Sequence, residues 1–184
     1  MLYSFINKLR RDVLKRKKEV YLDRLVQRGL KLGKNVEIID TFFFDPSHCF
    51  LITIGDNTTI CPNVRLIAHD ASTKKSLGYT KIGKITIGEN CFIGDSATIL
   101  LNVTIGANSI IGAGSVVTKP VPPSSVAAGN PAVVISGTDR YLKKISEYRK
   151  SKKVFSKDYY IEKLDEKKRS EILDSVADSI GFIV

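Results

Sequence analysis

The 184-residue sequence has few cysteines, few histidines and no long apolar run. Its three cysteines, Cys49, Cys61 and Cys91, include no CxxC pair, which argues against a disulfide framework and a thiolate metal site and predicts reduced, buried side chains. Nowhere does the sequence approach the roughly eighteen consecutive apolar residues of a membrane span. The N-terminus also lacks the apolar core and small-residue cleavage site of a secretory signal. We therefore expect a cytoplasmic protein.

Acidic residues are outnumbered, and the formal net charge is +10, but the excess lies at the two ends of the chain. Residues 1–31 carry 10 basic against 3 acidic side chains, and residues 139–184 carry 12 against 9. The centre, residues 32–138, carries 7 against 7. A neutral centre with basic ends is not a basic groove, so we expect no nucleic-acid partner.

The centre contains a repeat with a period of six. Stepping by six from residue 87 gives a large aliphatic residue each time: Ile87, Ile93, Ile99, Ile105, Ile111 and Val117. Glycine follows four of these six residues. This period is typical of short strands joined by tight turns whose conformation glycine supplies. Each unit buries little alone, so the units should stack into a coil with the aliphatic residues pointing inward in columns.

The repeat continues upstream in a different phase. Copies begin at Ile54, Ile60 and Leu66, but Leu66 and Ile87 are 21 residues apart, which is not a multiple of six. Residues 69–84 are polar and contain two glycines, the composition of an exposed loop. We therefore expect residues 69–84 to leave the coil and return to it, in a position suited to function.

Two segments carry a family resemblance: IGENCFIGDSATIL (87–100) and TIGANSIIGAGSVVTKPVPPSSVAAGNPAVVI (104–135). They resemble the hexapeptide-repeat acyltransferase superfamily, and within it the bacterial sugar and polysaccharide O-acetyltransferases related to galactoside and maltose acetyltransferases. The resemblance implies an all-β core, a left-handed parallel β-helix of hexapeptide repeats with α-helical extensions at both ends. It also implies a homotrimer that binds acetyl-CoA as co-substrate between neighbouring subunits.

Three segments follow from this interpretation. Residues 1–31 form an amphipathic basic helical extension, residues 32–138 the catalytic β-helix with its loop excursion at 69–84, and residues 139–184 a C-terminal helical extension. The N-terminal helix is predicted from Leu2, Ile6, Leu9 and Val13, which recur at three- and four-residue spacing. We expect it to pack on the end of the coil or on a neighbouring subunit, and we favour this over association with a membrane surface.

His69 is the candidate base, because it stands where the coil gives way to the loop and the family uses the histidine at this motif. Imidazole can take the proton of an attacking hydroxyl and return it to a leaving thiolate. Adjacent side chains of an extended segment point apart, so Asp70 should not orient His69; a backbone carbonyl or another acidic residue could do so. Asp45, His48 and Asp70 are the candidate residues around the acceptor. For Asp45 and His48, a turn that merely satisfies backbone groups is an equal alternative.

Candidate coenzyme contacts also come from the resemblance: Asp95, Ser96, Ala97, Ala113, Ser115, Thr118, Lys119 and Pro131. Small side chains would let pantetheine approach backbone amides, and Lys119 could meet a phosphate. The glycines of the same segment, Gly112 and Gly114, could equally serve only the turns of the repeat. Asp95 departs from the family pattern, which often has serine there, so either the contact passes through its backbone or its carboxylate faces elsewhere.

Other chemistries find less support. Only two histidines are present, whereas catalytic zinc takes three protein ligands, so we expect no metal cofactor. No GxSxG motif indicates a serine hydrolase. The predicted function is acetyl-CoA-dependent O-acetyl transfer to a sugar hydroxyl, in surface polysaccharide or oligosaccharide biosynthesis. The alternatives are N-acetylation of a nucleotide-linked amino sugar and a non-catalytic β-helix assembly module.

Overall fold

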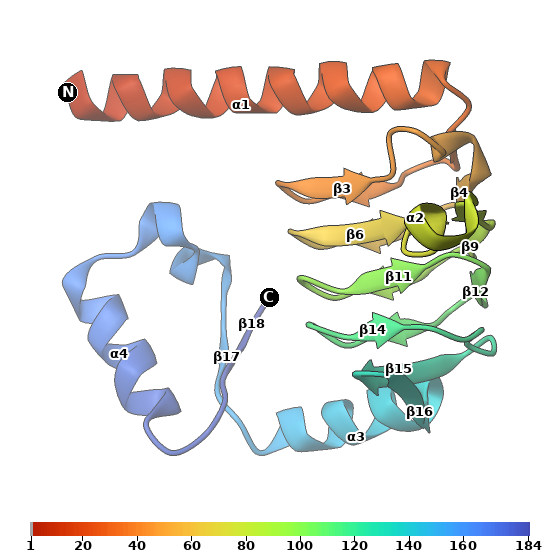
Figure 1. Cartoon of the computed structure of the whole chain (residues 1–184). Helices are drawn as coiled ribbons and strands as arrows, with labels where there is room; N and C mark the ends of the chain where they lie inside the picture. The colour runs from red at the N-terminus through yellow and green to blue at the C-terminus, as the bar shows by residue number, and fades with distance from the viewer. Residues whose placement is uncertain (1) are drawn as a thin grey trace. The chain divides into compact units, whose positions relative to one another are not determined.

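The computed structural model describes residues 2–184, without the side chains of residues 2–12, 14 and 15. It divides into two compact units, Met1–Thr138 and Asp139–Val184. The first unit contains helix α1 (Leu2–Gln27) and a stack of short strands, shown from orange to teal in Figure 1. The second unit is mainly helical.

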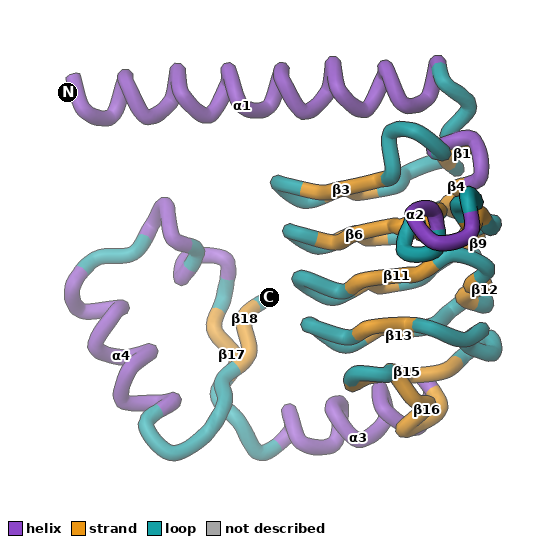
Figure 2. The backbone as a smooth tube through the Cα atoms, viewed as in Figure 1, coloured by secondary structure: helices purple, strands orange, loops and turns teal. Residues whose placement is uncertain are grey.

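The stack consists of three sheets within the described residues, and their strands pair in parallel except for the last two strands of the second sheet. As far as residue 117, successive strands of these sheets lie in the first, second and third sheet in turn, so the chain winds as a three-sided coil. Figure 2 shows its turns stacked on one another. The first sheet contains β1 (Lys31–Leu32), β4 (Ile52–Ile54), β9 (Ile85–Ile87) and β12 (Val103–Ile105). The second contains β2 (Glu37–Ile38), β5 (Thr59–Ile60), β10 (Phe92–Ile93), β13 (Ile110–Ile111), β15 (Ser125–Gly129) and β16 (Ala132–Gly137). The third contains β3 (Phe42–Phe44), β6 (Val64–Ile67), β11 (Thr98–Leu100) and β14 (Val116–Val117).

The period-six residues form the core of this coil. The side chains of Ile87, Ile93, Ile99, Ile105, Ile111 and Val117 are all at most 1% exposed. Full burial of one such side chain contributes about 1.5–3 kcal/mol. The prediction of inward-pointing columns is therefore confirmed, as is a β-rich core of parallel strands with helices at both ends of the chain.

The glycines of the repeat have a different role from the one expected. The left-handed turn positions are held mainly by asparagines, with φ between 53° and 62° at Asn35, Asn57, Asn63, Asn90, Asn102 and Asn108. Asparagine tolerates this region better than other side chains. Gly88 instead stands where two turns of the coil approach, because an added Cβ would lie 2.6 Å from the backbone nitrogen of Ala107. The prediction that these glycines supply the turn conformations is thus wrong for Gly88.

The number of residues per turn of the coil is not constant. The register between β9 and β12 pairs Ile85 with Val103, an offset of 18, or three hexapeptides. Between β1 and β4 the offset is 22, and between β4 and β9 it is 33. The two long turns have four and fifteen extra residues, and both sets lie between a strand of the third sheet and the next strand of the first sheet. All of the inserted residues therefore lie at one corner of the coil.

The extra residues form four short elements. Helix η1 (Cys49–Leu51) lies in the shorter insertion. The longer insertion contains β7 (His69–Asp70), α2 (Lys74–Leu77) and β8 (Lys81–Ile82), with β7 and β8 paired antiparallel. All three cysteines of the chain are free and buried, as the sequence predicted.

The C-terminal part of α1 covers the first turn of the coil. Leu25 is fully buried, the Tyr21 ring lies 5.5 Å from that of Phe42, and Lys18 Nζ donates to the carbonyl oxygen of Ile38 at 2.8 Å. Val13, one of the predicted apolar positions, is exposed; the side chains of Leu2, Ile6 and Leu9 lie outside the described residues. Among the helices described, none is long and apolar enough to cross a membrane.

The second unit begins with α3 (Thr138–Lys150), of which only the first residue belongs to the first unit. It contains β17 (Val154–Phe155), η2 (Lys157–Tyr159), η3 (Ile161–Lys163), α4 (Glu166–Val176) and β18 (Phe182–Ile183). β17 and β18 pair in parallel, Phe155 is buried, and the Asp165 side chain caps α4 by accepting from the Lys168 amide at 2.8 Å.

Candidate active site at one corner of the coil

Asp45 begins the shorter insertion and is locked in place by backbone contacts. Its amide donates to the Leu66 carbonyl at 2.9 Å, which continues the pairing of β3 with β6 by one residue. Its Oδ1 accepts the amides of Ser47 at 3.1 Å and His48 at 3.2 Å, so the carboxylate closes an Asx turn. The side chain is completely buried. A carboxylate is thus held inside the corner from which the chain turns outward.

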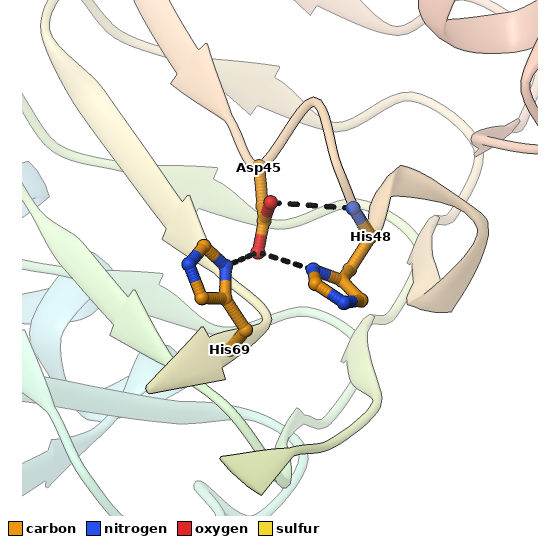
Figure 3. A group of neighbouring side chains, drawn as sticks. All are labelled: Asp45, His48 and His69. Carbon is orange, nitrogen blue, oxygen red and sulfur yellow. Dashed lines mark hydrogen bonds and ion pairs between the residues drawn. The ribbon is translucent and has the colours of Figure 1, made fainter. Parts of the chain in front are cut away.

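His69 begins the longer insertion, one turn further along the coil. Its ring nitrogen Nδ1 is hydrogen-bonded to Asp45 Oδ2 (Figure 3). An ionised carboxylate can only accept, so Nδ1 carries the proton and Nε2 keeps a free lone pair. About a third of the His69 side chain, 34%, is exposed, so a substrate can reach it. The pair therefore presents an oriented imidazole to solvent.

The pKa of Asp45 shows which form of the pair is favoured. Burial alone would raise the pKa of this carboxyl. The hydrogen bond and charge of His69, the amide of Ser47 and the charge of His48 outweigh burial and hold the pKa below its ordinary value of 3.8. Asp45 is therefore ionised at neutral pH, as an acceptor for the Nδ1 proton of His69 must be.

His48 lies beside the same carboxylate. Its Nδ1 is 3.6 Å from Asp45 Oδ2, and its ring centroid is 4.9 Å from that of His69 (Figure 3). The Nδ1 atom is buried and, among the described residues, has no hydrogen-bond partner. The side chain as a whole is 26% exposed. The structure thus brings Asp45, His48 and His69 together at one point.

Asp70 belongs to a different cluster. Its Oδ2 pairs with Lys81 Nζ at 2.5 Å and its Oδ1 accepts the Ser72 amide at 2.8 Å. The Lys81 hydrogen bond and the Ser72 contacts hold the pKa of Asp70 far below its ordinary value. These contacts fasten the base of the loop, where β7 pairs with β8.

The candidate coenzyme residues lie at two corners of the coil. Asp95 and Ser96 form the turn between β10 and β11, and Gly114 of the next turn donates to the Asp95 carbonyl at 2.7 Å. The Asp95 carboxylate accepts the Ser96 hydroxyl at 2.8 Å. Ala97 and Ser115 are fully buried, so neither residue offers surface to a coenzyme in this chain. Ala113, beside Gly114, is exposed.

Thr118 and Lys119 lie at the same corner as His69. They follow β14, just as His69 follows β6, and are two turns further along the coil. Two strand spacings amount to about 10 Å. Both residues are exposed, as is Pro131 between β15 and β16. The imidazole and the lysine therefore lie in one column along this corner, two turns of the coil apart.

Sequence reasoning did not find the pairing of Asp45 with His69. The two residues are 24 positions apart, two more than the 22-residue register between Phe44 and Leu66. Only that register places the residue after β3 next to the segment after β6. The available signal was Asp45, an acidic residue directly after the apolar Phe42–Phe44 run. It lies one turn of the coil before His69.

Comparisons with known proteins point to one family. The family model "Bacterial transferase hexapeptide (six repeats)" matches residues 84–119. Protein CapG of Staphylococcus aureus is 37% identical over 139 residues, which are 71% of this chain and 79% of CapG. Galactoside O-acetyltransferase of Escherichia coli K12 is 42% identical over 142 residues, which are 74% of this chain and 61% of that protein.

Solved structures agree with these relatives. Galactoside acetyltransferase in complex with coenzyme A shares 36% identity at a TM-score of 0.51, over 61% of this chain and 62% of that one. The Vibrio cholerae acetyltransferase VCA0836, complexed with acetyl-coenzyme A, shares 27% identity at a TM-score of 0.55, over 60% and 61%. The chain thus spans about three fifths of these structures. The resemblance to an acyltransferase and the expected acetyl-CoA co-substrate are confirmed, and the chain belongs to the hexapeptide-repeat acetyltransferases.

Proposed function

We propose that this protein transfers the acetyl group of acetyl-CoA to a hydroxyl of a sugar or glycan acceptor, in surface polysaccharide or oligosaccharide biosynthesis. The observation that carries the proposal is the contact of the partly exposed His69 with the buried Asp45. It supplies a general base with a defined tautomer at the end of a column that can accommodate the coenzyme.

His69 acts as general base in a direct transfer. Its Nε2 accepts the proton of the sugar hydroxyl while the hydroxyl oxygen forms a bond to the thioester carbonyl carbon. The tetrahedral intermediate then collapses, the carbon–sulfur bond breaks, and His69 returns the proton to the departing CoA thiolate. The products are the acetyl ester and free CoA. No nucleophile is required, so both substrates are bound together.

Asp45 has a positioning role in this mechanism. The sequence suggested a contact with the acceptor, but the carboxylate is fully buried and engaged by His69 and two backbone amides. It holds Nδ1–H and stabilises the imidazolium that forms during proton transfer. Contact with the acceptor falls instead to the exposed part of His48 and to the loop that Asp70 and Lys81 fasten.

The coenzyme would run along this corner of the coil from His69 towards Lys119. In this placement the thioester lies near Nε2, and the Lys119 ammonium meets a phosphate about two turns away. The turns at Asp95–Ser96 and Ala113–Gly114 would offer backbone groups to pantetheine, with Pro131 near the adenine end. Support comes from the exposure of Thr118, Lys119 and Pro131.

The coil would be left-handed and the active form a homotrimer, as expected for this family. Three successive apolar side chains of β16, Val133, Val134 and Ile135, are exposed and would be covered by a neighbouring subunit. Coenzyme bound between two subunits then gives three sites per trimer.

The acceptor class is supported by the relatives. One is a galactoside O-acetyltransferase, and a similar structure, 29% identical at a TM-score of 0.50, is a polySia-specific acetyltransferase. The test measures release of CoA thiol from acetyl-CoA with galactosides, maltose and acidic glycans, each beside its amino-sugar counterpart, and identifies the product by mass spectrometry. We expect acetyl esters of hydroxyl acceptors. Acetyl amides as the main products would instead support the N-acetyltransferase. If no acceptor of either set causes release of CoA thiol, the result would support the assembly module.

A further inference from the structure

We propose that Asp45, His48 and His69 form a binding site for a divalent transition-metal ion of the Zn²⁺ class, and that the bound ion competes with acetyl transfer by occupying the base. The ion is an inhibitor in this proposal and takes no part in the reaction. The proposed site is supported by two imidazoles and one carboxylate that come together from two turns of the coil (Figure 3).

The distances suit a metal after small side-chain rotations. Each of the three residues offers one ligand atom, and these atoms lie within 4.8 Å of one another. Ligands at about 2.0–2.2 Å from a tetrahedral zinc are about 3.3 Å apart. Asp45 Oδ2 and His48 Nδ1, separated by 3.6 Å, are already near this spacing. His69 is closer to Asp45 than this spacing, so its ring has to move away from the carboxylate to admit the ion.

The Nδ1 atom of His48 is a ligand atom without a partner. It is buried and, within the described part of the chain, accepts or donates no hydrogen bond. An unsatisfied buried polar atom is costly, and its distance of 3.6 Å from Asp45 Oδ2 exceeds a hydrogen bond. A metal ion between the three residues would satisfy it. This is a second observation, independent of the clustering, that points to a ligand.

The donor set selects the class of ion. Two imidazole nitrogens and one carboxylate oxygen suit Zn²⁺, Co²⁺ or Ni²⁺, whereas Mg²⁺ and Ca²⁺ prefer oxygen ligands alone. His48 and His69 are the two histidines of the whole sequence, so they account for its full imidazole content. Both rings are partly exposed, so the cluster lies next to solvent.

Metal binding at Nδ1 removes the base by changing the tautomer. A neutral imidazole carries one proton, and the Nδ1 proton of His69 faces Asp45 in the metal-free pair. When an ion takes Nδ1, that proton has to reside on Nε2. Nε2 then has no lone pair to accept the proton of a hydroxyl. One occupied site therefore blocks one base without any contact with the coenzyme.

Binding is tested on the full, untagged chain without substrates. Zn²⁺ affinity is measured by competition with a chromophoric chelator, and Co²⁺ by its visible absorption. We expect one ion per chain, at least about tenfold weaker binding for His48→Gln and for His48→Asn, and no competition from Mg²⁺. The matched control is Cys49→Ser, because the adjacent Cys49 Sγ faces the carbonyls of Leu25 and Arg28 at 3.5 and 3.8 Å, and this variant should bind like wild type.

Two results would overturn the site: a wild-type chain that binds no Zn²⁺, or equal affinities for wild type and a folded His48 variant. Circular dichroism establishes that each variant is folded. His48 is partly exposed, so its amide variants are expected to fold. A loss of binding in Cys49→Ser but not in His48→Gln would assign the ion to the thiol and also overturn the proposal.

Inhibition is a separate measurement, and this part rests on the proposed function. Transfer is followed in zinc-buffered solution, because the CoA thiol released by the reaction itself binds Zn²⁺. Wild-type activity should fall at the free Zn²⁺ concentration at which the site fills, and the midpoint should rise about tenfold or more in His48→Gln. Equal midpoints would contradict competition at this site. If no acceptor supports transfer, the proposed function fails while the binding measurement still decides the metal site.

Discussion

Two regions of the coil differ in the number of residues that each turn uses. From β9 to β14 the turns follow an offset of 18 residues, whereas the two preceding turns use 22 and 33. Every strand of the long turns still pairs with its neighbours, because the added residues all lie at one corner. Asp45, His48 and His69 come from these additions. The repeat therefore provides a rigid frame, and the candidate catalytic residues lie where insertions interrupt the repeat.

The two regions also bury different groups. The regular turns enclose aliphatic side chains with exposures of 0–1%, while the corner buries a carboxylate and leaves two imidazoles partly exposed. A substitution in the frame should therefore change stability, and one at the corner should change transfer. Single substitutions at both places test this separation.

His69→Ala should lower kcat by about 10²–10⁴-fold, the usual contribution of a general base. Binding of coenzyme A, measured by calorimetry, should stay near the wild-type value, because the candidate contacts lie elsewhere along the coil. CoA thiol release with a productive acceptor is the activity measurement. Substantial activity in this variant would contradict the role of His69 as general base.

Ile99→Ala tests the frame. Ile99 is fully buried in β11 between Leu66 and Val117, and removal of such a side chain costs about 2–5 kcal/mol of unfolding free energy. Urea denaturation measures the loss, with the exposed Thr104→Ala of β12 as the control, which should change stability by about 0.5 kcal/mol or less. Activity per folded molecule should be unchanged. A fall in kcat for folded Ile99→Ala would contradict the separation.

Asp45→Asn should lower kcat by about 10–100-fold with little change in the KM for acetyl-CoA. An amide can donate to Nδ1 of His69 and so favour the tautomer that carries its proton on Nε2. Steady-state kinetics across pH provide the measurement, since loss of a positioning carboxylate should alter the pH profile and not only the amount of active enzyme. An unchanged profile with fewer active molecules would reduce Asp45 to a structural residue.

Asp45 should also make stability depend on acid pH. Its pKa in the folded state is below the ordinary 3.8, so its stabilising contribution is complete above about pH 5 and is lost as pH falls through the folded pKa. The difference in unfolding free energy between wild type and Asp45→Asn should therefore narrow below pH 4. Denaturation curves from pH 6 to pH 3 test this. If the difference in unfolding free energy grows on acidification, the pKa of Asp45 is not lowered in the folded state.

Asp70→Asn should have the smallest effect. Its contacts with Lys81 and Ser72 lie at the exposed base of the loop, where ion pairs contribute little and are screened by salt. We expect kcat to be nearly unchanged and the acceptor KM to rise by up to about fivefold at low salt. A loss of kcat like that of His69→Ala would place Asp70 in the proton transfer.

The frame was more predictable than the corner. A strict period of six indicates the buried columns, because one aliphatic residue per unit has to find a stacked neighbour. The phase break between Leu66 and Ile87 likewise indicates the long insertion. The left-handed turns were assigned to the wrong residue type, since Gly88 is required by the close approach of Ala107 and the turn itself uses Asn90.

The pairing of Asp45 with His69 was beyond sequence reasoning for a physical reason. The shorter insertion adds four residues, and only the acidic residue after the apolar Phe42–Phe44 run marks where it starts. Without the register between β3 and β6, the distance between the two side chains is undetermined. Ala97 and Ser115 show the reverse case: their small size suggested close approach of pantetheine, but both side chains face the interior.

The last strand of the second sheet also determines where the coil stops. A parallel stack ends in unpaired N–H and C=O groups, which are a template for polymerisation with another chain. β16 runs back along β15 in antiparallel register, from Ser125 opposite Gly137 to Gly129 opposite Ala132, so a further parallel turn cannot continue that sheet in phase. With α1 over the first turn, the coil has a finite height. The chain itself therefore limits the length of coil along which a coenzyme could lie.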